Sequence, residues 1–194
     1  MGYLKYVRKL YSDSKSMKEL APVLAERKKT LRGEPPIVRV QHPTRPDRAR
    51  QYGYRAKQGY AIARVKIRAG GLRKKRPSRG RKPAGMGINK ITAGKSIQRM
   101  AEERAAKKYT NMEVLASYWV YKDGKTHWYE VIMIDPSHPA IKSDKKINWI
   151  TKATPGRAVR GKTPAGKKGR GQRKKGMGTE KNRPSLGANQ RRAK

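Results

Sequence analysis

The last segment of the sequence, residues 151–194, constrains the fold most, because it offers almost nothing from which a core could be built. Basic residues, glycine and other small or polar residues dominate it, and Glu180 is its only acid. Ordering a backbone costs on the order of 1 kcal/mol per residue, and the sparse, aperiodic apolar residues give no burial to offset that cost. We therefore expect a basic extension that is disordered without a partner.

The whole chain shares this excess of positive charge. It has 51 Lys and Arg against 13 Asp and Glu, a net charge of +38. A compact body with so much like charge repels itself, so a polyanion is expected to supply counter-charge. No run approaches the roughly 18 apolar residues of a membrane-spanning helix, which makes a membrane the weakest candidate. The N-terminus lacks the apolar core of a signal peptide, and without cysteine there is no disulfide or thiolate zinc site, so we expect a cytoplasmic or nuclear protein.

Residues 1–36 form a predicted helical segment ahead of the main body. Apolar residues recur there at three- and four-residue spacing from Tyr3 to about Leu31. Ser16 and Glu19 have the spacing of a capping box for a second helix. Pro22 clashes with a preceding helical turn, so this helix begins near Glu19 or is kinked.

Residues 37–150 form the predicted globular body, a small, mostly antiparallel sheet flanked by helices, of the α+β class. Strands are expected over 37–41 and 60–68, and a β-hairpin over 113–135 around Lys-Asp-Gly-Lys. The hairpin is apolar on both faces, which predicts a place inside the sheet with cover on both sides. A long basic loop, residues 70–90, interrupts the body, and loops of that length in compact domains usually have a function.

An amphipathic helix is expected over residues 96–109, with Ser96 as its N-cap. Glu103 and Lys107 have the spacing of an ion pair one turn apart. Its predicted buried stripe is Ile97, Met100, Ala101 and Ala105, and its predicted outer face is Gln98, Glu102, Glu103 and Lys107.

The residues do not favour an enzyme, a metal site or a cofactor. Asp135, Ser137 and His138 lie too close together along the chain to converge as a catalytic triad. Gly94-Lys95-Ser96 resembles the end of a phosphate-binding loop but lacks the first glycine, since Asn89 stands there. Lys95 is instead expected near the N-terminal amides of the helix, where an RNA phosphate could bind.

Basic segments give the stronger signal. In residues 63–68, Ala63, Val65 and Ile67 alternate with basic residues, so a strand is expected to turn one face inward and a cationic row outward. That row leads into the Lys/Arg loop with no acid between Arg64 and Lys82. Cations of one sign repel each other unless an anion lies across them, which indicates contact with phosphate.

The stretch PTRPDRARQYGYRAKQGY (43–60) interleaves arginines with tyrosines around one acid, Asp47. Asp47 is expected to pair with Arg45 or Arg50. The tyrosine rings suit stacking on unpaired bases, but core packing is an equally open alternative, most of all for Tyr60. The predicted RNA-binding residues of the chain are Arg45, Arg48, Arg50, Tyr52, Tyr54, Arg55, Lys57, Arg64, Lys66, Arg68, Arg73, Lys74, Lys75, Arg76, Arg79, Arg81, Lys82, Lys95, Arg157, Arg160, Lys162, Lys167, Lys168, Arg170, Arg173, Lys174 and Lys175.

Several ordered blocks resemble the L-fifteen-e family of archaeal and eukaryotic large-ribosomal-subunit proteins. The blocks are residues 43–60, ARVKIRAGG (63–71), KSIQRMAEERAAKKYTNMEVLASYWV (95–120), WYEVIMIDPSHPAIKSD (128–144) and RGKTPAGKKGRG (160–171). The resemblance covers essentially the whole chain. It implies a structural protein of the ribosome, with large-subunit ribosomal RNA and neighbouring ribosomal proteins as partners and no small-molecule substrate. The absence of cysteine and the GTEKNRPS ending favour an archaeal member.

The leading hypothesis is therefore a non-enzymatic ribosomal RNA-binding protein. Its basic extensions would fill crevices of a large structured RNA. The alternatives are a DNA-compacting protein, another RNA-binding protein, or an RNA-modifying or nucleotide-hydrolysing enzyme.

Overall fold

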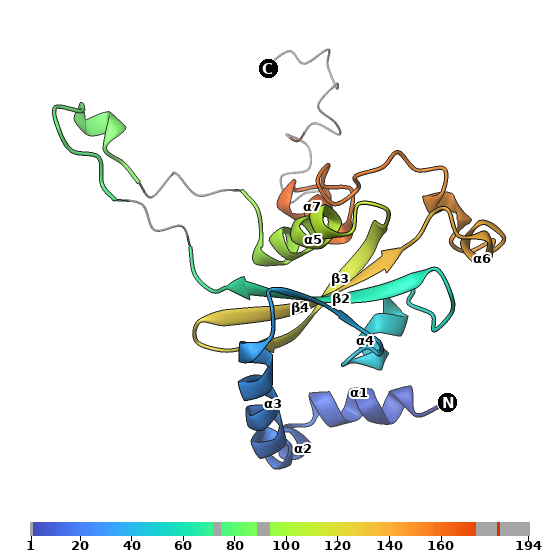
Figure 1. Ribbon diagram of the computed structural model, residues 1–194. Coiled ribbons are helices and arrows are strands. Elements are labelled where there is room, and N and C mark those ends of the chain that lie inside the picture. The colour runs from blue at the N-terminus through green and yellow to red at the C-terminus, as the bar shows by residue number, and fades with distance from the viewer. Residues whose placement is uncertain (1, 72–74, 89–93, 174–181, 183–194) are drawn as a thin grey trace.

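The computed structural model describes residues 2–71, 75–88, 94–173 and 182. A four-stranded antiparallel sheet lies at its centre, with the strand order β1-β2-β4-β3 (Figure 1). The strands are β1 (Ile37–Val40), β2 (Tyr60–Arg68), β3 (Glu113–Lys122) and β4 (Thr126–Ile134). The predicted α+β class, both early strands and the hairpin are confirmed. The prediction that the whole hairpin lies inside the sheet is wrong, because β3 is an edge strand and only β4 is internal.

Helix α5 (Ile97–Lys108) covers one face of the sheet, as Figure 1 shows. The Ser96 hydroxyl accepts the backbone N–H of Arg99, which confirms the predicted N-cap. Ala101 and Ala105 are fully buried against Ala63, Val65 and their neighbours, and small side chains let the helix lie close to the strands. We call the face of the sheet that α5 covers the α5 face.

Three predictions about α5 and the residue before its N-cap are wrong. Glu102 is fully buried rather than exposed. Glu103 pairs with Arg99, 3.0 Å away and one turn earlier, rather than with Lys107. Lys95 also pairs with Glu103, at 2.8 Å, so its ammonium group does not lie at the helix amides as expected.

The opposite face of the sheet is covered by α3 (Ala21–Gly33) and α4 (Pro46–Gln51). Leu24, Leu31 and Ala49 are buried there against Trp128 and Ile132 of β4. Strand β4 thus has cover on both faces, as the apolar residues on both faces of the hairpin predict.

The N-terminal segment holds two further helices, α1 (Leu4–Ser12) and α2 (Ser14–Glu19), which lie below the sheet in Figure 1. The N-cap of α2 is Asp13, whose carboxylate accepts the N–H groups of Lys15 and Ser16, so the predicted capping box at Ser16 is wrong. Pro22 lies in the first turn of α3, where a missing N–H costs nothing. This arrangement confirms a new helix start close to Glu19.

After β4 the chain forms α6 (Pro139–Lys142) and a 3₁₀ turn (Asn148–Ile150). Ile141, Ile147 and Ile150 pack with Ile134 into a third cluster at one end of the sheet.

The C-terminal segment departs from the sequence prediction in its first part. Residues 151–173 pack on the body and include α7 (Pro164–Gly169), which lies beside α5 in Figure 1. Ala158, Thr163 and Ala165 are buried, so the expectation of no burial after residue 151 is wrong there. Residues 174–181 and 183–194 lie outside the described residues, and their predicted dependence on a partner stays a prediction.

Residues 75–88 are the described part of the basic loop. They are largely exposed, contain a 3₁₀ turn (Pro83–Gly85), and stand clear of the sheet in Figure 1. Lys75, Arg76, Arg79, Arg81 and Lys82 are all exposed. The predicted site residues Arg73 and Lys74 lie outside the described residues.

Candidate nucleic-acid interface

A buried carboxylate, Glu130 of β4, fixes the start of the stretch 43–60. Glu130 is fully buried. It accepts the phenol O–H of Tyr118 at 2.5 Å and the backbone N–H of Thr44 at 3.0 Å, and the Thr44 hydroxyl donates to it as well. Arg64 lies 3.8 Å from it and is held by Glu34 through a 2.8 Å ion pair. Burial and the neighbouring Glu130 raise the pKa of Tyr118, so its phenol stays protonated and donates.

Protein contacts also organise the rest of this stretch. Asp47 pairs with Arg45 at 2.8 Å, which confirms one of the two predicted partners. Arg45 is nearly buried, with its guanidinium 4.2 Å from the ring centre of Tyr11. Lys57 pairs with Asp144 at 2.6 Å. These two cations are therefore engaged inside the protein, although both were predicted to bind RNA.

The tyrosines of the stretch pack against other tyrosines. The ring of Tyr52 lies parallel to that of Tyr118, with centres 6.4 Å apart, and Tyr54 meets Tyr60 edge to face at 5.9 Å. The structure therefore supports the packing alternative for Tyr54 and Tyr60. Tyr52 keeps an exposed face. The exposed cations that this stretch presents are Arg48, Arg50 and Arg55.

At the end of β2, five cations line a depression of about 1000 Å³, which we call the sheet-end groove. They come from α3, β2, α5 and the β3–β4 turn, and none of the described residues that line the groove is acidic. The predicted outward row is thus divided, since Arg64 is paired internally whereas Lys66 and Arg68 reach the groove. The lining cations are Arg32, Lys66, Arg68, Arg104 and Lys125.

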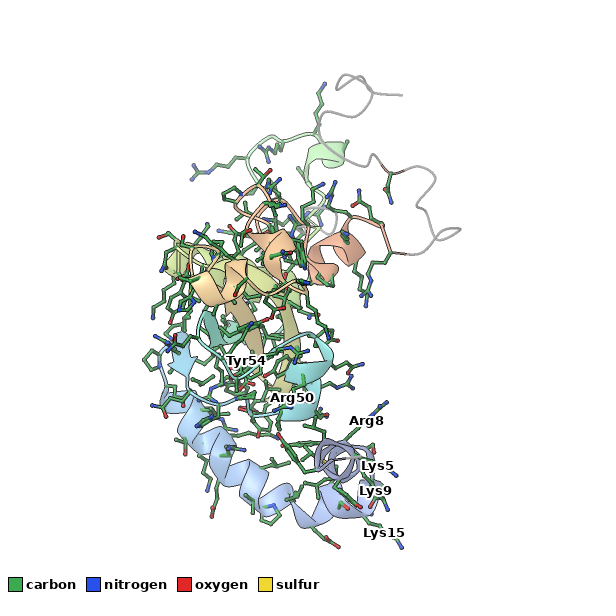
Figure 2. The ribbon with its side chains drawn as sticks, turned by 90° about the vertical axis from the view of Figure 1, so that its right-hand side faces the viewer. Lys5, Arg8, Lys9, Lys15, Arg50 and Tyr54 are labelled. Carbon is green, nitrogen blue, oxygen red and sulfur yellow. The ribbon has the colours of Figure 1, made fainter. Side chains whose placement is uncertain are left out.

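The sequence reasoning missed a second basic surface. Lys5, Arg8 and Lys9 extend from α1 and Lys15 from α2, below the helix that carries Arg50 (Figure 2). Helical spacing of i, i+3 and i+4 places the first three on one side of α1, and that spacing would have revealed them. Arg50 itself lines a smaller depression of about 390 Å³ with Gly53, Tyr54 and Arg55.

A third region is the clasp, residues 154–171, which folds over α5 and the start of β3. Buried Glu102 accepts the hydroxyls of Ser117, at 2.6 Å, and of Thr163, which itself caps α7. Burial raises the pKa of the Glu102 carboxyl, while these hydroxyls oppose that rise. Glu113 accepts the backbone N–H groups of Gly156 and Arg157. Two acids of the body thus hold the C-terminal segment in place.

Predicted site residues in the clasp have different surroundings. Arg157 donates to the carbonyl of Val114 and lies 4.6 Å from the ring centre of Trp149. Arg160 donates to the carbonyls of Thr154 and Pro155. Lys167 and Lys168 are exposed at the end of α7, and Arg173 is exposed beyond it. Lys162 and Arg170 are half-buried, and Lys174 and Lys175 lie outside the described residues.

Replacing Gly166 by alanine is expected to loosen the clasp. A Cβ at this position would lie 2.5 Å from the Cα of Gly161, a backbone atom that a rotamer change cannot move away. Overpacking of this kind typically costs about 1–3 kcal/mol. Amide exchange of residues 157–168 should therefore become faster, while exchange in β2 and β4 stays the same.

The matched control is Gly169→Ala in the same helix, where the nearest atom to an added Cβ is the carbonyl oxygen of Gly94 at 3.6 Å. This variant should exchange like the wild type. Unchanged exchange in Gly166→Ala would show that the close approach does not hold the clasp.

The catalytic alternatives find no support in the geometry. Asp135 accepts the backbone N–H of Ser137, and His138 accepts that of Ala140 as the N-cap of α6. Asp135 and His138 therefore stabilise the turn after β4 and the start of α6. Among the described residues, no three acidic or histidine side chains cluster as metal ligands, and no helix is both long and apolar enough to cross a membrane.

Comparisons with known proteins agree with this geometry. The family model described as Ribosomal L15 matches residues 2–189. The large ribosomal subunit protein eL15 of Methanocella arvoryzae is 60% identical over 170 residues, which cover 87% of this chain and 87% of that protein. The eL15 of Methanospirillum hungatei is 60% identical over 173 residues, 89% of this chain and 88% of that protein. That of Methanococcoides burtonii is 61% identical over 170 residues, 87% and 86% of the two chains.

These relatives come from archaeal methanogens, as the sequence features favoured. Identity of this level over nearly the full length, together with the family match, establishes the relationship. The chain belongs to the Ribosomal L15 family of structural, non-enzymatic ribosomal proteins.

Proposed function

We propose that this protein, a structural constituent of the large ribosomal subunit, binds and stabilises large-subunit ribosomal RNA by neutralising its phosphates. Its basic segments fill crevices of the folded RNA, and neighbouring ribosomal proteins are further partners. The place of action is the ribosome.

The observation that carries this proposal is that the cations fall into two groups, those paired with acids near the core and those on the surface. Arg45, Lys57 and Arg64, close to the core, are each paired with an acid. Of the groove cations, Arg32 pairs with Asp123, whereas none of the ion pairs among the described residues includes Lys66, Arg68, Arg104 or Lys125. The labelled cations of α1 extend outward in Figure 2. Because a cluster of like charges repels itself without counter-charge, these outward surfaces support a polyanionic partner. Guanidinium groups can also hold phosphate oxygens in bidentate geometry.

Competition between nucleic acids tests the proposal. The full chain is mixed with a folded fragment of large-subunit RNA and with duplex DNA of equal phosphate content. If crevice fitting matters, the RNA displaces the DNA from the protein and the DNA does not displace the RNA. Equal competition would support a DNA-compacting protein instead and would contradict the proposal.

Sedimentation provides the matching test in the assembled state. The native protein should migrate with large-subunit particles and remain with them through a high-salt wash. Release by that wash would place the protein outside the particle and contradict a structural role.

A further inference from the structure

A row of aromatic rings lies on the α5 face, at the end of the sheet where β3 turns into β4. Trp119 of β3 lies directly opposite Tyr129 of β4 in the strand register. His127 is two residues before Tyr129 and therefore on the same face. The rings of His127 and Tyr129 are nearly parallel, 22° apart, with centres separated by 6.2 Å. Tyr129 thus has Trp119 as its cross-strand neighbour in the register and His127 as its stacked neighbour along β4.

Helix α5 stops short of this row. The buried cluster under α5 includes Val65 and Val131, and Tyr129 is only partly buried where it packs against this cluster. Figure 1 shows the hairpin end of the sheet extending beyond the helix. Trp119 remains 47% exposed on the edge strand. Large aromatic rings stabilise a protein when they are covered, so a ring left open beside two others indicates a surface that a partner covers.

The surroundings of the row are cationic. Lys122 lies opposite His127 in the register and is exposed. Arg104 of α5 is also exposed, and it lines the sheet-end groove together with Thr126, the residue before His127. The acids close in sequence are already engaged, since Asp123 pairs with Arg32 at 2.7 Å and Glu103 pairs with Lys95 and Arg99. Burial and Lys122 lower the pKa of His127, so its ring is uncharged at neutral pH. Flat uncharged rings within a basic border suit bases attached to phosphates.

We propose that Trp119, Tyr129 and His127 form a stacking platform for unpaired bases of RNA, with Lys122 and Arg104 on the adjoining phosphates. The inference rests on the proposed RNA-binding function and adds a site that recognises bases rather than charge alone. Every base has a flat face, so the platform accepts different sequences but requires a single strand. A duplex hides those faces by stacking its own bases.

Short oligonucleotides test the platform with the full chain. One probe is a ten-nucleotide single-stranded RNA, and the other is the same ribose–phosphate strand without bases. The wild type should bind the RNA more tightly than the abasic strand. Since stacking contributes about 5- to 150-fold per base, Trp119→Ala should weaken RNA binding by a factor in that range and leave abasic binding unchanged. Trp119→Phe should retain most of the difference, because a stacking ring remains.

Trp149→Ala is the matched control. Trp149 is 44% exposed, close to the value for Trp119, but its ring faces the guanidinium of Arg157. The control should bind the RNA like the wild type. An equal loss in both variants, or no loss in Trp119→Ala, would overturn the platform.

Trp119→Lys separates the effect of stacking from that of charge, and this variant is expected to fold. Lysine is well tolerated on an exposed edge strand. If charge alone governs binding, the added cation tightens binding to both probes; if the ring stacks, RNA binding weakens while abasic binding does not. Tighter binding of Trp119→Lys to the RNA would overturn the inference. Failure of the wild type to bind either probe would instead contradict the proposed RNA-binding function, so the two failures are distinguishable.

Discussion

Replacing Glu130 by alanine should lower the free energy of unfolding by about 3–5 kcal/mol, the range found when one partner of a buried ionic cluster is removed. Glu130 is fully buried and lies at the centre of its cluster. Its loss would leave the Tyr118 phenol and the Thr44 amide without their acceptor. Arg64 would keep Glu34, so the cost is concentrated on the groups that face the core.

Urea unfolding of the full chain measures this change. The exposed acid Glu26 provides the control, because its replacement by alanine changes the net charge equally and should alter stability by no more than about 0.5 kcal/mol. Glu130→Gln retains one acceptor oxygen and should fall between the two. A Glu130→Ala variant as stable as Glu26→Ala would show that the cluster does not stabilise the fold.

The same variant connects the core to the interface. Glu130 accepts the N–H of Thr44, just before α4, and α4 carries Arg48 and Arg50 outward. Amide exchange of residues 44–52 should therefore accelerate with the loss of stability. Contacts within the protein thus order the stretch 43–60, so the proposed RNA partner would meet cations that are already in position.

Sequence patterns predicted the sheet well because strands and amphipathic helices have fixed periods. The alternation of Ala63, Val65 and Ile67 and the turn residues at Asp123-Gly124 depend only on local chemistry. The same periodicity predicted Glu102 on the solvent-exposed face of the helix, whereas the structure has it fully buried. Position in a helical repeat does not reveal that Ser117 and Thr163, distant in the chain, supply hydroxyls to a buried carboxylate.

Prediction of the candidate interface has the same limit, because local sequence does not reveal contacts between residues distant in the chain. Charge density marked the basic regions, but it did not reveal which cations had acid partners, because Asp144 and Glu34 are far in sequence from Lys57 and Arg64. The clasp was missed for a related reason. Its burial uses small residues such as Ala158 and a close approach of two glycines, and neither gives an apolar pattern. Trp119 was overlooked because a strand-former in a hairpin is expected to be covered.

The affinity of the full chain for large-subunit RNA should fall steeply with salt. A protein that contacts six to ten phosphates loses about 10³- to 10⁵-fold in affinity between 50 and 200 mM salt, because binding releases counterions condensed on the RNA. The sheet-end groove, the exposed part of the clasp and the helix α1 with its cations Lys5, Arg8 and Lys9 together offer enough cations for six to ten phosphate contacts. A filter-binding titration at several salt concentrations gives the slope directly. An affinity independent of salt would contradict phosphate neutralisation.

Groove variants show whether this slope arises where the structure places it. Replacing Arg68, Arg104 and Lys125 by glutamine should reduce the slope by nearly 3, about 0.9 for each phosphate on a duplex and less on a single strand. The control replaces Lys142, Lys145 and Lys146, which are exposed around α6 at the opposite end of the sheet from the β3–β4 turn (Figure 1). Both variants remove three positive charges. If net charge alone attracted the RNA, the two slopes would fall together, whereas a slope that falls only in the groove variant assigns those phosphates to the sheet end.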